Sequence, residues 1–330
     1  STRSLGQNWK SMQPGFDFIL GYQPDTNWIN RKGLKGILSK DPLFNTLIQQ
    51  RFDQRLNITA LLQPIRNLNI DINFDKTFTK NYTELFKDTS ATLTEGFKRL
   101  NPYALGSFSI SYISFQTLFK KFDPNIVSGT FRQFEANRII LSKRVSETNP
   151  YWTGVVGPDG YSQGYGRYAQ DVIIPAFISA YTNKDPLSVS LMKNSNPKLN
   201  ANPFSGLKAK PNWNVTYNAT SIKGLEKVFT NIMIRHGYRS TLNMNSYNSA
   251  LFFQDPFHYG YPEFVDPLTG NFVPYFFVPN ITITEEFSPL FALDMTFTNR
   301  LTARMEYRKS RQLSLSLIDY QLAENRSEEV

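Results

Sequence analysis

Alternation of apolar and polar residues with a period of two recurs along most of the chain. In the stretches 51–64 and 67–79, apolar side chains occupy most of the alternate positions, and the positions between them carry mostly polar side chains. Successive side chains of a β-strand point to opposite faces, so the pattern predicts two amphipathic strands joined by a short turn at 64–66. Shorter alternating runs predict further strands at 16–22, 108–112, 213–217 and 232–234.

The longest alternating run extends from 291 to 308, near the end of the chain. It predicts a single strand of roughly 50 Å at about 3.3 Å per residue. A tight turn is then expected at Lys309 and Ser310, before another run that starts at Leu313. Typical strands have about 5–6 residues, and a tilted barrel strand needs only about 9–11 residues to cross a bilayer. The length therefore favours a transmembrane β-barrel whose strands project beyond the bilayer.

A strand in the wall of such a barrel has one face toward lipid and the other toward a wet lumen. The alternating polar positions of these runs are predicted to face the lumen. They are Arg51, Asp53, Arg55, Asn69, Asp71, Asn73, Asp294, Arg300, Arg304, Glu306 and Arg308. The alternating apolar positions are predicted to face lipid. They are Leu56, Ile58, Leu68, Ile70, Ile72, Phe74, Leu293, Met295, Phe297, Leu313 and Leu315.

Two stretches interrupt the strand pattern. The first, 115–208, contains helical segments predicted at 130–145 and 168–181, and the second, 246–279, is rich in Pro, Gly, Phe and Tyr and predicts an ordered loop. The expected organisation is barrel strands at 1–114, a helix-containing cap or rim at 115–208, strands at 209–245, the ordered loop at 246–279 and long strands at 280–330.

The second predicted helix has apolar residues at spacings of three and four, which indicates a buried helical stripe. The members of this stripe are Val172, Ile173, Ala176, Phe177 and Ala180. Two predicted strands separate the two interruptions, so an up-and-down meander places both at the same end of the barrel, which for long connections is usually the extracellular end. The aromatic residues expected to help cover the stripe are Phe252, Phe253, Phe257 and Tyr259.

Composition limits the classes of protein that remain. Hydrophobic residues make up 40% of the chain and aromatic residues 15%, but no run of eighteen apolar residues predicts a membrane-spanning helix. The absence of cysteine excludes disulfides and thiolate metal sites. The net charge of +9 is spread along the chain without a basic stripe, so a solvated surface is expected and nucleic acid is not an expected partner.

Candidate chemistry is sparse. The glycines between 154 and 166 match neither the Rossmann nor the P-loop spacing of phosphate-binding loops. His236 and His258 have no second histidine at the spacing of metal ligands. No nucleophile-elbow motif occurs, so no enzyme activity, catalytic residue, cofactor or metal site is expected. Six Asn-x-Thr/Ser motifs have a simple cause, because Asn and Thr two positions apart share one face of a strand. They begin at Asn57, Asn81, Asn214, Asn218, Asn280 and Asn325.

Several short segments carry a family resemblance beyond periodicity. They are FSPLFALD at 287–294, NRLTA at 299–303, EYRK at 306–309, LSLSL at 313–317, QLAE at 321–324, QDVIIPAF at 170–177, AYT at 180–182, KDP at 184–186 and SFSIS at 107–111. In combination they resemble the SprA/Sov family, the outer-membrane translocon of the Bacteroidetes type IX secretion system. The resemblance covers essentially the whole chain but only a minor part of a family member, so the chain is expected to be an internal segment.

The resemblance implies a wall segment of a very large antiparallel β-barrel in the bacterial outer membrane, through which folded cargo proteins are exported. It implies as partners the remainder of the same barrel chain, a smaller outer-membrane barrel shuttle (PorV-like), a plug protein, secreted cargo, and lipid with lipopolysaccharide. No catalytic residues accompany the family. Two other classes remain open from the residues alone: a different outer-membrane barrel that transports nutrients or lipopolysaccharide, and a soluble all-β binding protein.

Overall fold

The computed structural model describes residues 28–330, except 42, 90–95, 122, 124, 194, 196, 197 and 221. Its elements in chain order are α2 (Trp28–Leu34), β1 (Ile48–Leu62), β2 (Leu68–Asp88), β3 (Phe97–Ser111), α3 (Phe115–Leu118), α4 (Gly129–Ser146), α5 (Gln170–Tyr181), β4 (Asn212–Asn218), η1 (Leu225–Lys227), β5 (Phe229–Ser249), β6 (Phe276–Phe277), β7 (Asn280–Phe297), β8 (Thr302–Ser316) and β9 (Leu322–Glu329). Strands dominate, as the alternation predicts. The strand expected at 16–22 lies outside the described residues.

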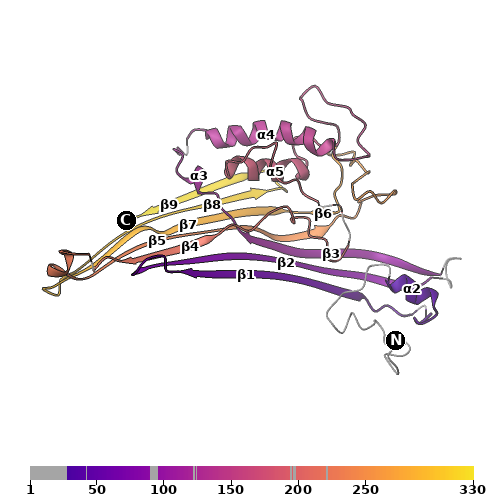
Figure 1. Cartoon of the computed structure of the whole chain (residues 1–330). Helices are drawn as coiled ribbons and strands as arrows, with labels where there is room; N and C mark the ends of the chain where they lie inside the picture. The colour runs from indigo at the N-terminus through magenta and orange to yellow at the C-terminus, as the bar shows by residue number, and fades with distance from the viewer. Residues whose placement is uncertain are drawn as a thin grey trace.

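The strands form one antiparallel sheet of nine strands in the order β1-β2-β3-β5-β7-β8-β9. β4 pairs with β2 and β5, and β6 pairs with β5. Figure 1 shows the sheet as a single long layer with α3, α4 and α5 on one side, and the strands continue beyond these helices toward their short hairpins. Among the described strands, β1 and β9 each have a neighbour on one side only.

β3 and β4 lie on the same line of the sheet, between β2 and β5. β2 pairs with β3 as far as Ile110 and with β4 from Asn212 onward. The Ser111 hydroxyl donates to the carbonyl of Lys210 over 2.7 Å, and the Lys210 N–H donates to the carbonyl of Ser111 over 2.9 Å. The chain thus leaves the sheet in mid-strand and returns to the same point. Residues 112–211, called the insertion below, form this excursion.

The hairpin predicted near the start of the chain is confirmed. β1 and β2 pair without a register shift from Ile48 opposite Glu84 to Leu62 opposite Ile70. The turn places Asn67 at a φ of 68°, a left-handed conformation that asparagine tolerates better than most residues.

The single strand predicted from 291 to 308 is wrong, because β7 and β8 are two strands of a hairpin. The turn lies at 298–301, where the Phe297 N–H donates to the carbonyl of Leu301 and the Asn299 side chain accepts from the Leu301 N–H. No turn occurs at Lys309 and Ser310, where β8 runs on without interruption. Across this hairpin odd-numbered residues pair with odd-numbered ones, as Leu293 does with Met305. The apolar residues of both strands therefore keep the same alternation as a single long strand would have.

Both predicted helices are confirmed as α4 and α5, and they pack against one face of the sheet. Every residue of α5 is buried, which agrees with the predicted stripe. The core between α5 and the sheet includes Phe108, Leu242, Ile283 and Leu313. The insertion therefore covers an apolar part of the sheet that would otherwise be open to water.

The loop after β5 also contacts the insertion, although β5 extends to Ser249, beyond the predicted boundary at 245. The Gln170 side chain at the start of α5 donates to the carbonyl of Phe276 over 2.8 Å and accepts from the Val278 N–H over 2.7 Å. The aromatic residues that reach this core differ from those predicted, because Phe252, Phe257 and Tyr259 are largely exposed. Phe253 contacts Tyr275 of the same loop, with ring centroids 5.4 Å apart, but is not itself part of the core. The residues of the loop that do pack there are Phe272, Tyr275, Phe276 and Val278.

Candidate functional site

The strand pairing separates the side chains of the sheet into a polar face and an apolar face. Directly opposed residues lie on the same face, and successive residues alternate between faces. The polar face carries Asn57, Asn69, Asp71, Asn73, Asp75, Asn214, Arg235, Arg239, Glu286, Asp294, Arg304 and Glu306. The apolar face carries Leu56, Ile58, Leu68, Ile70, Ile72, Phe74, Trp213, Val215, Ile232, Ile234, Leu293, Met295 and Met305, and the insertion packs on this same face.

Short polar side chains bridge neighbouring strands on the polar face. The Asn57 amide donates to Asp75 over 2.5 Å, and the Thr59 hydroxyl donates to Asn73 over 3.0 Å. All six asparagines of the Asn-x-Thr/Ser motifs lie at strand positions of this face. The motif therefore follows the alternation of the sheet, as expected for a wetted surface.

An ion-pair network crosses three strands of the polar face. Arg235 on β5 pairs with Asp294 on β7 over 2.8 Å, and Arg304 on β8 reaches the same carboxylate over 3.4 Å. Glu306 pairs with Arg304 and also with Arg308, the latter over 2.5 Å. Arg235 is not among the residues predicted to face a lumen, although the alternation through Ile232 and Ile234 places it on the polar face.

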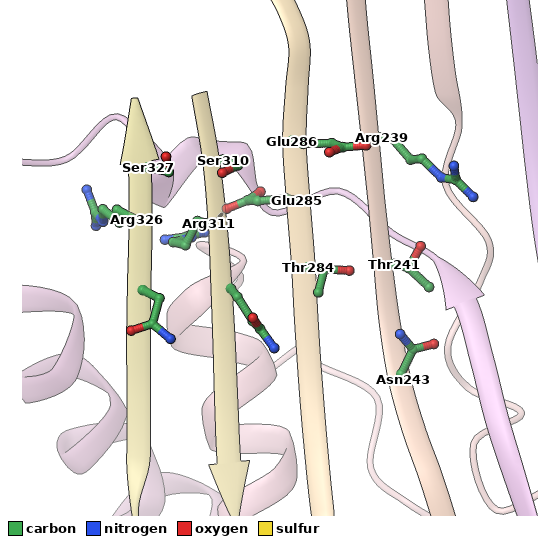
Figure 2. A pocket seen from close by; sticks show the side chains of 12 residues that line it. Arg239, Thr241, Asn243, Thr284, Glu285, Glu286, Ser310, Arg311, Arg326 and Ser327 are labelled. Atoms are coloured by element: carbon green, nitrogen blue, oxygen red, sulfur yellow. Dashed lines mark ion pairs between the residues drawn. The ribbon is translucent and has the colours of Figure 1, made fainter. Parts of the chain in front are cut away.

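A shallow pocket lies on the polar face beside this network, across β5, β7, β8 and β9. Figure 2 shows its lining, with Arg239, Thr241 and Asn243 on one strand and Thr284 and Glu286 on the next, while the helices lie behind the strands. A second open depression on the same face includes Asn57, Asn73, Asn214, Arg235 and Glu286. Both are lined mainly by amide, hydroxyl and charged groups, so the face is wettable along its whole width.

Ten of the eleven residues predicted to face a lumen lie on the polar face. They are Arg51, Asp53, Arg55, Asn69, Asp71, Asn73, Asp294, Arg304, Glu306 and Arg308. Arg300 does not, because it occupies the turn between β7 and β8 with a φ of 70°. Its prediction depended on the single long strand that the hairpin replaces.

The residues predicted to face lipid lie on the apolar face. Those near the short hairpins lie beyond the insertion, and Leu56 and Ile58 there are 43% and 48% exposed. Four further apolar residues of the same face, Val215, Ile232, Ile234 and Met305, lie among them. We call the whole set the apolar band: Leu56, Ile58, Leu68, Ile70, Ile72, Phe74, Val215, Ile232, Ile234, Leu293, Met295, Phe297 and Met305. Leu313 and Leu315 need correction, since both are buried beneath the insertion and cannot contact lipid. Their alternation reflects packing against the insertion.

Aromatic rings mark the boundary between the apolar band and the insertion. Phe115 of α3 contacts Tyr238 and Phe287 with ring centroids 5.2 and 5.9 Å apart, and it meets Trp213 edge-on at 6.2 Å. Trp213 in turn lies opposite Ile72 of the band. α3 is therefore the part of the insertion closest to the band.

A buried polar cluster fixes α3 to the sheet. Glu285 on β7 and Arg311 on β8 form an ion pair in which the side chains are 0% and 1% exposed. Ser114 joins it, because its hydroxyl donates to Glu285 over 2.6 Å and its carbonyl accepts from Arg311 over 3.2 Å. Tyr238 also donates to Glu285, over 3.2 Å. We call Ser114, Tyr238, Glu285 and Arg311 the polar anchor.

Lys80 of β2 is another charged group enclosed beneath the insertion. Its side chain is fully buried, its ammonium donates to the carbonyl of Lys198 over 2.6 Å, and it lies 4.7 Å from the ring centre of Phe276. Burial disfavours the charged form and lowers the pKa of Lys80 to about 7. The group is thus a source of pH-dependent stability at the junction of sheet and insertion.

The described residues hold no cluster of three or more His, Cys, Asp or Glu side chains that could bind a metal ion. His236 hydrogen-bonds through Nδ1 to the carbonyl of Leu290 over 2.7 Å and lies beside Trp213, so it has a structural role. The glycine-rich loop contributes to packing, since Gly164 forms a bridge with Asn271 of the second loop. The described helices include none with the length and apolar character needed to cross a bilayer.

Comparisons with protein-family models and with curated proteins find no match to this chain. The two faces of the sheet, and the insertion that covers part of the apolar face, are the features that bear on function.

Proposed function

We propose that this chain forms part of the wall of a large outer-membrane β-barrel that conducts folded proteins, the function implied by its resemblance to the type IX secretion translocon. The polar face lines the conduit, and the apolar band contacts lipid. The chain acts as a scaffold and surface, and no chemical step is assigned to it.

The separation of the two faces is the observation that carries the proposal. A band of apolar side chains crosses neighbouring strands next to the short hairpins, and the opposite face of the same strands is charged or amide-bearing. Leu56, Ile58 and Met305 of the band are 43–62% exposed, and all the others except the buried Ile232 are partly exposed. A soluble sheet buries its apolar face against a second layer. Here the only layer on that face, among the described residues, stops at α3.

The height of the band agrees with a bilayer. From Phe229 to Tyr238 on β5 the strand spans about 30 Å at roughly 3.3 Å per residue. A tilt of about 40° reduces this to about 23 Å, close to the apolar band of about 25 Å on known barrels. Phe229 packs on Phe297 with ring centroids 4.7 Å apart at the hairpin end, and Trp213, Tyr238 and Phe287 lie at the other end. Aromatic residues at both borders are typical of barrel girdles.

The unpaired edges of the sheet support a barrel with more strands than the structure describes. The seven strands of the main path extend over about 29 Å at a spacing of about 4.8 Å. β1 and β9 still have unpaired outer edges among the described strands. An edge that lies in a membrane needs a neighbouring strand, because lipid cannot satisfy its N–H and C=O groups. Further strands of the same barrel would supply those neighbours.

Site-specific crosslinking in actively secreting cells tests the proposal. A photo-activatable amino acid is introduced in the full-length protein at Asn214, an exposed position of the polar face, or at Ile58 in the apolar band as the matched control. Cargo protein in transit should crosslink to position 214, whereas position 58 should give lipid adducts. Active secretion without any cargo adduct at position 214 would refute a protein-conducting polar face and favour a barrel for smaller solutes.

A further inference from the structure

We infer that the start of the insertion, residues Phe115 to Lys121, is an interfacial ledge that lies in the headgroup layer of the membrane and binds the phosphate groups of anionic lipids. This inference rests on the proposed function, because it needs the apolar band to face lipid. It adds that the insertion lies on the outer surface of the barrel wall, beside the bilayer and outside the conduit.

The insertion packs on the same face of the sheet as the apolar band. The buried residues Phe78, Leu242 and Leu313 under α4 and α5 lie on the same face of the sheet as the apolar band. A face cannot contact lipid along one part of a strand and line the lumen along the next part, unless the strand twists through the wall. The insertion therefore continues the lipid-side surface beyond the bilayer.

α3 lies at the border between the insertion and the apolar band. Figure 1 shows α3 at the end of the insertion nearest the short hairpins, above the point where the uncovered part of the sheet begins. Phe115 and Leu118 belong to a cluster with Trp213, Phe287 and Leu290, which borders the band. Rings at the border of an apolar band lie at headgroup depth in known barrels.

An exposed aromatic ring continues this border outward. The Phe119 side chain is 51% exposed, yet its ring is held 5.6 Å from that of Phe287. The Lys309 ammonium lies 5.4 Å from the same ring centre and is also paired with Glu328. A fixed, exposed phenyl group beside an apolar band is favourable in the interfacial layer of a membrane and unfavourable in water.

Two lysines supply the charge. Lys120 and Lys121 are exposed, and neither forms an ion pair within the part of the chain that the structure describes. Arg326 of β9 donates to the backbone carbonyls of Leu118 and Lys120 over 3.0 and 2.9 Å. This contact holds the backbone of the ledge against the sheet while the two ammonium groups stay available.

The nearest acidic group on the same segment does not neutralise them. Asp123 accepts a hydrogen bond from the Asn125 N–H over 2.9 Å, which turns its carboxylate to its own turn. Lysines beside an exposed ring at the edge of an apolar band are complementary to lipid phosphates, and each lysine near an anionic surface can strengthen binding by up to about fivefold. A lipid surface therefore fits the ledge better than an acidic protein, which would leave Phe119 without an apolar partner.

Depth-dependent fluorescence quenching tests the ledge in the full-length protein. The chain has no cysteine of its own, so single cysteines are introduced by Phe119→Cys, Ile70→Cys or Asp71→Cys and labelled with an environment-sensitive fluorophore. The protein is reconstituted in vesicles of phosphatidylcholine and phosphatidylglycerol that carry a spin label either on the headgroup or deep in the acyl chain. We expect headgroup quenching at position 119, acyl-chain quenching at position 70 and no lipid quenching at position 71.

The three positions distinguish the two hypotheses. Lipid quenching at position 70 without any at position 119 overturns the ledge and leaves the proposed function intact. A position 70 that no lipid label quenches overturns the proposed function and the ledge with it.

The lysines are tested by the identity of the lipid near position 119. Spin-labelled phosphatidylglycerol should quench there about twofold or more better than spin-labelled phosphatidylcholine. Lys120→Gln with Lys121→Gln should reduce this ratio to about one, whereas Arg132→Gln with Lys143→Gln, on the exposed side of α4, should not change it. Quenching at position 70 verifies that each variant is inserted. An unchanged ratio in the Lys120 and Lys121 variant refutes phosphate binding by the ledge.

Discussion

Glu285 and Arg311 form an ion pair between neighbouring strands that is almost completely enclosed by the sheet and the insertion. Ser114 and Tyr238 hydrogen-bond to this pair, and Arg311 also pairs with Glu324 of β9 over 3.6 Å, so the pair connects β7, β8 and β9 to the start of α3. Burying two charges costs solvation energy that only mutual pairing and hydrogen bonds offset. The pair is therefore sensitive to the loss of either member.

Removing one member of the polar anchor should release the insertion. Arg311→Met leaves the Glu285 carboxylate buried without its cation, and the expected cost is about 3–5 kcal/mol. The double variant Glu285→Met with Arg311→Met should cost less, because the fully buried carboxylate is removed together with its cation and Glu324 keeps its pairing with Arg326 over 2.8 Å. Protease protection of the insertion as a function of urea measures both. Arg304→Met on the polar face, where Arg304 is 58% exposed, is the control, with an expected cost of about 0–1 kcal/mol; an equal loss in the two single variants would contradict the role of burial.

Adjacent residues of β2 should differ in their tolerance of charge. Ile70→Arg places a guanidinium on the apolar band, with an expected cost of about 2–4 kcal/mol near the middle of the bilayer, whereas Asp71→Arg on the polar face should cost little. Equilibrium folding into lipid vesicles compares the two variants. Equal tolerance at both positions would mean that the apolar band does not contact lipid.

The stability of the junction under the insertion should rise with pH above about 7. The pKa of Lys80 is about 7 in the folded state and 10.5 in its usual range. Between these values the unfolded chain binds more protons than the folded one, so the folded state gains stability as pH increases. Lys80→Met should therefore stabilise the protein most at or below pH 7, and this gain should shrink toward pH 10. Protease protection of the insertion at several pH values measures it, with Lys76→Met on the same strand as the control; a gain that is constant with pH would refute the assignment.

Gly106 should not accept a side chain. A Cβ built there would lie 2.0 Å from the Thr79 carbonyl oxygen and 2.4 Å from the Tyr247 hydroxyl, which crosses the glycine to donate to that carbonyl. Gly106→Ala must displace backbone, and we expect a loss of about 1–3 kcal/mol. Gly129→Ala at the start of α4 has open space around its Cβ and is the matched control. Thermal unfolding of the two variants gives the comparison, and equal midpoints would show that this crossing adapts without strain.

The two faces of the sheet could be predicted because strand geometry relates sequence parity directly to side-chain direction. This rule holds for the hairpin of β1 and β2 and for ten of the eleven residues predicted on the polar face. It also indicates Arg235, which lies next to Ile234 on β5 and which the prediction missed. The helices α4 and α5 were equally predictable, since their apolar spacing differs from that of the strands.

The position of a turn was not predictable from parity. β7 and β8 pair residues of equal parity, so the alternation from Phe291 to Tyr307 is the same for one long strand and for a hairpin. Only the backbone hydrogen bonds around Asn299 and Leu301 decide between them. For this reason Arg300 was expected on a strand and is found in the turn.

What covers the apolar face was likewise decided by the tertiary structure. Leu293 and Leu313 share the same periodic signal, because alternation records only that a side chain avoids water. The chain leaves the sheet after Ser111 and returns at Asn212, and the insertion folds back over Leu313 while Leu293 stays beyond it. This distinction depends on contacts between residues far apart in the chain, which local periodicity cannot encode. The sequence thus determines the two faces of the sheet, and the long-range packing determines which part of the apolar face remains open.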